Sequence, residues 1–168
     1  GANSFLNAGA AYVFSKDQGG GDNWGQVKKL VALDRAANDS FGNSVAISGT
    51  TIVVGAYREN EDATGANTLS AAGSVYVFSK DLGGADNWGQ AKKIVASDRA
   101  VNDLFGYSVA IAGTTIVVGA YQEDEDITGA NTLNNAGAVY VFSKDQGGAD
   151  NWGQVKKLVA LDRAANDY

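Results

Sequence analysis

The sequence of 168 residues contains no cysteine, no histidine, no methionine and no proline. The absence of cysteine and histidine excludes a thiol nucleophile, a Ser-His-Asp triad, a zinc site of Cys or His ligands and haem ligation by those residues. It leaves the redox compartment open, because a secreted protein can lack disulfides. The formal net charge of -6 argues against a nucleic-acid partner, which requires a basic surface. No apolar run approaches the length that a transmembrane helix needs, so we expect no membrane insertion.

Internal repetition is the dominant feature of the chain. The pentapeptide Tyr-Val-Phe-Ser-Lys occurs three times with a fixed period of 64, beginning at Tyr12, Tyr76 and Tyr140. When residues 1–40 are aligned with 129–168, 34 of 40 positions are identical. A fixed period in this range is typical of repeat proteins, solenoids and propellers. We therefore divide the chain into a partial repeat that supplies the outer two strands of a unit (1–40) and two full repeats (41–104 and 105–168).

Each unit has the pattern of β-structure, and no segment has the apolar spacing of a long helix. Four strands are predicted in the first full unit: Ser44–Ile47, Thr51–Ala56, Ser74–Ser79 and Gln90–Ala96. The short connection Ser48–Thr50 predicts a tight hairpin with glycine at positive φ. Thr51–Ala56 does not alternate in polarity, which indicates a strand buried on both faces. The prediction is an all-β protein of tandem four-stranded antiparallel propeller blades, about 2.5 blades in number.

The fourth strand of each unit carries paired lysines, such as Lys92 and Lys93. Charged residues of this kind are typical of a solvated strand at the edge of a sheet, where they discourage edge-to-edge pairing. A basic stripe for an anionic partner is the alternative. We favour edge protection, because the lysines recur in every unit of a protein whose net charge is negative.

Three segments of the unit 41–104 carry a recognisable pattern: Phe41–Ile47, Ile52–Tyr57 and Gly73–Phe78. The second full unit repeats it at Phe105–Gly106, Val117–Tyr121 and Gly137–Phe142. This pattern resembles the FG-GAP repeat, named for its Phe-Gly and Gly-Ala-Pro signatures. The resemblance implies blades of integrin-like β-propellers of the kind found in many bacterial cell-surface proteins, and hence an extracellular or cell-surface location. It says little about function, since propellers support unrelated activities.

The sequence departs from the integrin-type repeat at two places. Integrin-type blades have an Asp-rich calcium loop between the first two strands, whereas this chain has Ser48–Thr50 and Ala112–Thr114 there, without a carboxylate. Because calcium requires six to eight oxygen ligands, that site is absent. The proline of the Gly-Ala-Pro signature is replaced by Tyr57 and Tyr121.

All four glutamates lie in the two loops between the second and third strands. In a blade, these loops emerge at the same rim as the linkers that carry Asp34, Asp39, Asp98 and Asp103, so we expect an acidic rim. One hypothesis is weak calcium binding by the loop carboxylates, Glu59, Glu61, Asp62, Glu123, Asp124, Glu125 and Asp126. The alternative, which we favour, is a solvated loop whose charge aids solubility. For Asp39 and Asp103 we predict a role in a backbone turn before each Phe-Gly step.

The tryptophans Trp24, Trp88 and Trp152 recur once per unit. They could form a platform for sugar binding, but one Trp at the same strand entrance of every unit favours packing against the neighbouring sheet. Catalysis is not expected, because loop carboxylates that are exposed offer neither the burial nor the asymmetry of an acid-base pair. We expect no enzyme.

The expected function is that of a non-catalytic extracellular structural or adhesive protein. Two and a half blades do not close a propeller, which typically has four to eight. We therefore expect an unpaired strand edge at Tyr12–Phe14, an uncovered sheet face at the C-terminal end, and self-association as a segment of a longer array, a head-to-tail assembly or a filament. The alternative is a binding module for a surface protein or glycan, with weak calcium binding as a further possibility.

Overall fold

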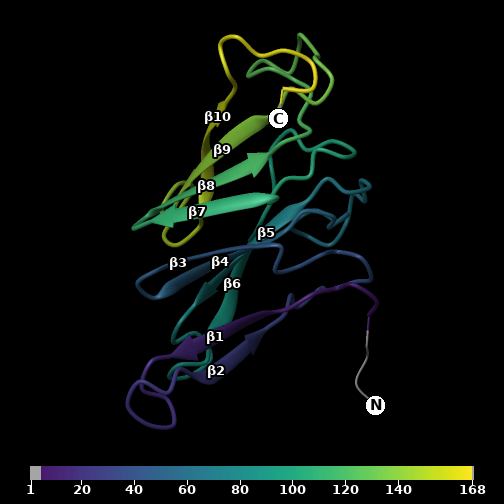
Figure 1. Ribbon diagram of the computed structural model, residues 1–168. Coiled ribbons are helices and arrows are strands. Elements are labelled where there is room, and N and C mark those ends of the chain that lie inside the picture. The colour runs from purple at the N-terminus through teal and green to yellow at the C-terminus, as the bar shows by residue number, and fades with distance from the viewer. Residues whose placement is uncertain (1–4, 168) are drawn as a thin grey trace.

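A computed structural model of the chain describes residues 5–167, which form ten β-strands in three antiparallel sheets (Figure 1). The first sheet has two strands, β1 (Ala11–Ser15) and β2 (Gly25–Leu30). The second has four strands, β3 (Ser44–Ser48), β4 (Thr51–Ala56), β5 (Ser74–Ser79) and β6 (Gly89–Ile94). The third has the equivalent strands β7 (Ser108–Ala112), β8 (Thr115–Ala120), β9 (Ala138–Ser143) and β10 (Gly153–Leu158).

Strands in both four-stranded sheets are paired in chain order, so each sheet is an up-and-down blade. The all-β prediction and the tandem four-stranded blades are confirmed. The described residues form no helix, and therefore none that is long and apolar enough to cross a membrane. The predicted hairpin is also present, because Gly49 has a φ of 56° between β3 and β4. Glycine enters this left-handed region without the steric cost that other residues incur.

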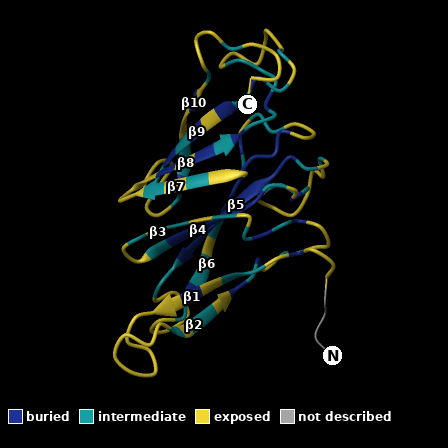
Figure 2. Cartoon of the chain, viewed as in Figure 1, coloured by how far each residue is buried: buried dark blue, intermediate teal, exposed yellow. Residues whose placement is uncertain are grey.

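The three sheets stack face to face, with β1 and β2 at the bottom of Figure 1 and β7–β10 at the top. Two hydrophobic cores fill the spaces between them. Val54 of β4 belongs to the core shared with the first sheet, and Val53 belongs to the core shared with the third. Both side chains are buried, as Figure 2 shows for β4. The prediction that this strand is buried on both faces is confirmed.

Tryptophan packing joins each unit to the one before it. Trp88 and Trp152 are both buried, the first in the core between the first and second sheets and the second in the core between the second and third. The prediction that the tryptophans pack against the neighbouring sheet is thus confirmed for Trp88 and Trp152. Trp24, which has no described sheet before it, is exposed.

Glycine allows the backbones of successive sheets to touch. Gly73 forms a parallel β-bridge with Phe105 of the next unit. A Cβ atom on Gly73 would lie 2.1 Å from the Phe105 carbonyl oxygen, and the φ of 86° also disfavours any other residue. The equivalent bridge between Gly9 and Phe41 links the first two sheets.

Every outer strand contains a β-bulge that sets the direction of its polar side chains. In the pairing of β5 with β6, Val77 lies opposite Lys92 and Phe78 opposite Gln90, so that Ala91 is the extra residue. The register of β2 and of β10 shifts at the equivalent place. Because of the bulge, Gln90 and Lys93 both reach toward the preceding repeat, although they are three positions apart. Lys92 alternates with Lys93 and reaches toward the following repeat.

Candidate functional site

The β4–β5 loop and the linker that follows β6 meet at one rim of the second sheet, as the topology predicts. Arg99 of the linker donates hydrogen bonds through Nη1 to the carbonyl of Asn67 (2.7 Å) and through Nη2 to that of Asn60 (2.6 Å). A backbone hydrogen bond from Asn102 to Ser70 joins the same two segments. Arg163 repeats this arrangement on the loop of the third sheet. The rim is therefore an ordered surface in which the loop is tied to the linker.

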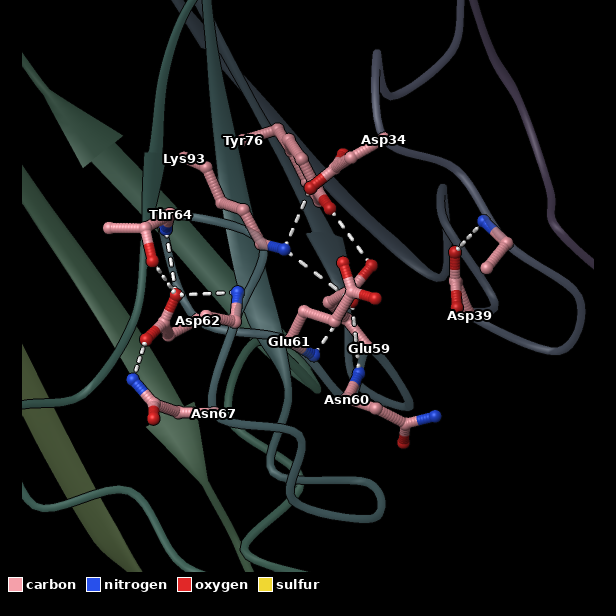
Figure 3. A network of polar contacts seen from close by, with 12 residues as sticks. Asp34, Asp39, Glu59, Asn60, Glu61, Asp62, Thr64, Asn67, Tyr76 and Lys93 are labelled. Atoms are coloured by element: carbon pink, nitrogen blue, oxygen red, sulfur yellow. Dashed lines mark hydrogen bonds and ion pairs between the residues drawn. The ribbon is translucent and has the colours of Figure 1, made fainter.

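Glu59 lies buried beneath this rim rather than in a solvated loop (Figure 3). Its Oε1 accepts hydrogen bonds from the backbone N–H groups of Asn60 (3.0 Å) and Glu61 (2.9 Å). Its Oε2 accepts a hydrogen bond from the hydroxyl of Tyr76 (3.0 Å). The expectation that the loop carboxylates are all solvated is wrong for Glu59, because the side chain turns inward toward the sheet.

Lys93 supplies the positive charge that Glu59 requires. Its Nζ lies 3.4 Å from Glu59 Oε1 and 2.8 Å from Asp34 Oδ2, and it sits over the ring of Tyr76 at 5.6 Å from the centroid. Figure 3 shows Lys93 between these two carboxylates. Asp34 comes from the linker of the preceding repeat. The ammonium group therefore joins two repeats and neutralises part of the buried acid charge.

The third sheet contains the same network. Lys157 Nζ lies 2.7 Å from Asp98 Oδ2 and 3.1 Å from Glu123 Oε1, and Tyr140 donates its hydroxyl to Glu123 Oε2 (2.8 Å). Burial by itself lowers the pKa of Lys157, but the hydrogen bond to Asp98 and the charge of Glu123 outweigh it and raise that pKa. Burial, with the charge of Glu123, also raises the pKa of Tyr140 far above its usual range. Lys157 is therefore charged and Tyr140 is a hydrogen-bond donor at neutral pH.

These networks correct the interpretation of the lysine pairs. The fourth strands do lie at sheet edges, but Lys93 and Lys157 are buried, so a solvated role is wrong for them. Lys92 is part-buried and donates to Asn151 Oδ1 of the next repeat (2.9 Å). Only Lys29 has the expected exposure among the lysines equivalent to Lys93, and it lies over the ring of Tyr12.

Asp39 and Asp103 are buried next to these networks and have the turn role that we predict. Asp39 Oδ2 accepts a hydrogen bond from the N–H of Ala36, and Asp103 Oδ2 from that of Ala100, each at 2.5 Å. Desolvation by burial raises the pKa of Asp39 from 3.8 to about 6, and the negative charge of Glu59 acts in the same direction. Desolvation and the charge of Glu123 raise the pKa of Asp103 to about 7.

Asp62 and Asp126 hold the tips of the two loops together. Asp62 Oδ1 accepts hydrogen bonds from the N–H (2.8 Å) and hydroxyl (2.6 Å) of Thr64 and from the N–H of Ala66 (3.1 Å). Its Oδ2 accepts one from the side-chain amide of Asn67 (2.5 Å). These hydrogen bonds, led by those of Thr64, hold the pKa of Asp62 well below its usual range. Asp126 repeats the arrangement with Thr128 and Asn131.

The loop carboxylates proposed for calcium therefore have separate surroundings. Glu59 and Glu123 face lysines, Asp62 and Asp126 face the donors of their own loops, and Asp124 Oδ1 accepts the N–H of Asn135 (2.6 Å). Glu61 and Glu125 are partly exposed. Within residues 5–167, no three acidic side chains are placed to share a metal ion. Weak calcium binding through this set stays a prediction.

The chemistry of the site is that of a structural tie rather than of an acid-base pair. Each buried glutamate has a lysine and a tyrosine hydroxyl as partners, and the same lysine fastens the linker of one repeat to the sheet of the next. Sequence reasoning missed this network, although a signal existed. Glu59, Tyr76 and Lys93 recur in the next repeat as Glu123, Tyr140 and Lys157, and the linker residue Asp34 recurs as Asp98.

Comparison with known protein families gives one result. A family model described as FG-GAP repeat matches residues 24–78 and 88–142. Each matched segment begins at a tryptophan, includes the outer strand of one sheet, and ends in the third strand of the next sheet. The matches thus include the linkers, Asp34 and Asp98 among them, that the buried lysines fasten. The comparison with curated proteins gave no match.

Proposed function

The chain belongs to the FG-GAP repeat family, and we propose that it is a non-catalytic structural or adhesive protein of the extracellular space or cell surface whose end blades stack against further repeats of the same kind, in a longer array or in other copies. Membership in this family supports the interpretation of the chain as a β-propeller repeat module. FG-GAP repeats are typically extracellular, which supports the proposed location. The observation that carries the stacking proposal is the difference in exposure between equivalent residues inside the chain and at its two ends.

The first sheet presents an uncovered aromatic face. Tyr12 is 51% exposed, whereas its equivalent Tyr76 is 0% exposed. Trp24 is 61% exposed, whereas its equivalent Trp88 is 6% exposed. Phe14 on the same face is exposed as well. In the second sheet, this face is covered by the preceding sheet, and we infer that the same kind of surface covers it in the first.

The third sheet presents the complementary aliphatic face. Val139 is 37% exposed, whereas its equivalent Val75 is 0% exposed. Leu158 is 46% exposed, whereas its equivalent Ile94 is 4% exposed. Val117 adds to this surface. Since the chain already packs an aliphatic face of this kind against an aromatic face at its internal junctions, the two ends are the two halves of one interface.

Polar side chains at the internal junctions would give this interface its register. Lys28 donates to Asn87 (2.7 Å), and Gln90 Oε1 accepts a hydrogen bond from the N–H of Leu33 (3.0 Å). Lys156, the equivalent of Lys28, lies on the third sheet, and Gln26, the equivalent of Gln90, lies on the first sheet, so the two are at opposite ends of the chain. A head-to-tail contact of this type is heterologous, so it forms a ring if the rotation closes and a filament if it does not.

Sedimentation of the full chain tests this proposal. We expect concentration-dependent association of the native chain and a monomer for either Trp24→Glu or Val139→Asp. A mixture of the two variants should form one-to-one dimers, because each retains the end that the other has lost. Ile127→Asp, a change at an exposed loop residue, is the matched control and should associate like the native chain. A monomeric native chain, or association that both end variants leave unchanged, would contradict the proposal.

A binding module for a surface ligand is the second candidate function. It is favoured by a groove at the junction of the second and third sheets, where three tyrosines meet.

A further inference from the structure

A groove of about 650 Å³ lies between the two full repeats, at the ends of their inner strands. Tyr57 follows β4, Tyr121 follows β8, and Tyr107 precedes β7. The ring centroids of Tyr57 and Tyr107 are 5.4 Å apart at an interplanar angle of 82°, and those of Tyr107 and Tyr121 are 4.4 Å apart at 55°. The three phenol rings thus pack against one another as an aromatic cluster at the groove, and the ring of Tyr107 is the most exposed of the three. The volume lies within the range of small-molecule sites, roughly 300–1,000 Å³.

The rest of the lining is mostly polar and almost uncharged, with Ala37, Ala71 and Leu104 as its apolar residues. Asn60 and Ser70 come from the β4–β5 loop, and Asn102 and Gln122 from segments that follow. Arg58 is the one charged side chain among the described lining residues, and its guanidinium lies 5.4 Å from the ring centroid of Tyr57. The groove therefore offers the exposed ring of Tyr107 and polar side chains, and it differs in charge from the acidic loops beside it.

Tyr107 is a point at which the two full repeats differ. Position 107 is equivalent to position 43, which is asparagine in the otherwise similar unit 41–104. Tyr76 and Tyr140 are buried in the cores, whereas Tyr107 is 45% exposed and belongs to neither core cluster. A large aromatic that is exposed at one junction and replaced by a small amide at the equivalent place indicates a local binding role.

We propose that the groove between Tyr57, Tyr107 and Tyr121 binds a neutral saccharide. A sugar ring has apolar C–H faces that suit the exposed ring of Tyr107, and hydroxyls that suit the polar side chains of the lining. An anion would be repelled by a protein of net charge -6 and a cation would meet Arg58, so neither charge is favoured.

This proposal goes beyond end-to-end stacking and does not depend on it. The groove lies at an internal junction, whereas stacking uses Trp24 at one end of the chain and Val139 at the other. A chain that binds saccharide as a monomer would refute only the stacking proposal. A chain that associates but binds no saccharide would refute only the groove.

The test is binding of a glycan array rich in neutral oligosaccharides, followed by calorimetric titration with the neutral oligosaccharide that gives the strongest signal. We expect the native chain to bind, and Tyr107→Asn to weaken the affinity by about tenfold or more through the loss of ring stacking. This variant also removes two ring contacts, so we expect its melting temperature to fall by about a few degrees, and the titration is run well below that temperature.

Ile127→Ser is the control, because it removes an exposed apolar side chain that lies outside both the groove and the stacking faces. It should bind the same oligosaccharide with unchanged affinity. The proposal is overturned if no neutral oligosaccharide binds, if Tyr107→Asn binds as tightly as the native chain, or if Ile127→Ser alone abolishes binding.

Discussion

The ammonium group of Lys93 lies 2.8 Å from the carboxylate of Asp34, a residue 59 positions earlier in the chain. Lys157 and Asp98 form the same contact at 2.7 Å with the same separation. Since lysine and aspartate belong to successive repeats, each ion pair is a contact between repeats. The second carboxylate, Glu59 or Glu123, comes from the repeat of the lysine itself. Stability of one repeat is therefore coupled to the presence of the one before it.

Removal of the Lys93 charge should strongly destabilise the protein. Lys93→Met leaves Asp34 and Glu59 without their cation in a buried setting, and we expect the free energy of unfolding to fall by about 3 to 5 kcal/mol. Urea unfolding, monitored by circular dichroism, measures this free energy. Lys29→Met is the matched control at the equivalent exposed position, with an expected change within about 0.5 kcal/mol. Equal effects of the two substitutions would show that the buried ion pairs contribute nothing specific.

A side chain at Gly73 should separate two sheets. Gly73→Ala places a Cβ atom against the Phe105 carbonyl oxygen at a φ of 86°, and we expect a loss of about 2 kcal/mol or more in thermal or urea unfolding. Gly21→Ala is the control, because a Cβ there has open space and the equivalent residues Ala85 and Ala149 already are alanine. If Gly73→Ala destabilised the protein no more than Gly21→Ala, this would contradict the close backbone contact between the two sheets at Gly73.

The two buried aspartates should make the protein less stable as the pH rises toward neutrality. In the folded state, the pKa of Asp39 is about 6 and that of Asp103 about 7, compared with 3.8 for an unperturbed group. Their stabilising contribution is therefore complete below pH 3.8 and is lost as the pH rises through 6 to 7. We expect the melting temperature to fall between pH 5 and pH 8 and the fall to be smaller in Asp39→Asn/Asp103→Asn. An unchanged slope in that variant would assign the pH dependence to other groups.

Strong acid should also destabilise the protein, in this case through the loop aspartates Asp62 and Asp126. The pKa values of Asp62 and Asp126 are lowered by their hydrogen bonds, so their contribution is present above the unfolded value of 3.8 and is lost as the pH falls below it. Stability is therefore expected to decline again in strong acid. Asp62→Asn/Asp126→Asn should weaken this decline, as measured by melting temperature between pH 2 and pH 5.

Micromolar calcium should leave the melting temperature unchanged. The oxygens of Glu59 and Asp62 already accept hydrogen bonds from the protein, so only weak binding by Glu61, Glu125 and their neighbours is expected. A ligand bound by the native state raises stability more the tighter it binds, so tight binding would be visible in a thermal scan. A clear shift at micromolar calcium, absent from Glu61→Gln/Glu125→Gln, would show that the loops do form a tight site.

The strands were predictable because their signals are local. Thr51–Ala56 is apolar almost throughout, Gly49 marks the hairpin, and Trp88 recurs at a fixed place in every unit. The burial of Lys93 could not be predicted in the same way. Its partners come from the linker of the preceding repeat and from the loop between β4 and β5, and only the stacking of the sheets brings them together. Likewise, Tyr107 differs from Asn43 in the sequence, but the meeting of three rings follows from the packing of two repeats.

The alternation of Lys92 and Lys93 along β6 gives the second sheet a front and a back. Lys93 reaches to Asp34 of the repeat behind, and Lys92 reaches to Asn151 of the repeat ahead. A sheet turned around would present its lysines to surfaces that carry neither acceptor in the right place. Every repeat in an array must therefore point the same way, and growth at one end is chemically different from growth at the other.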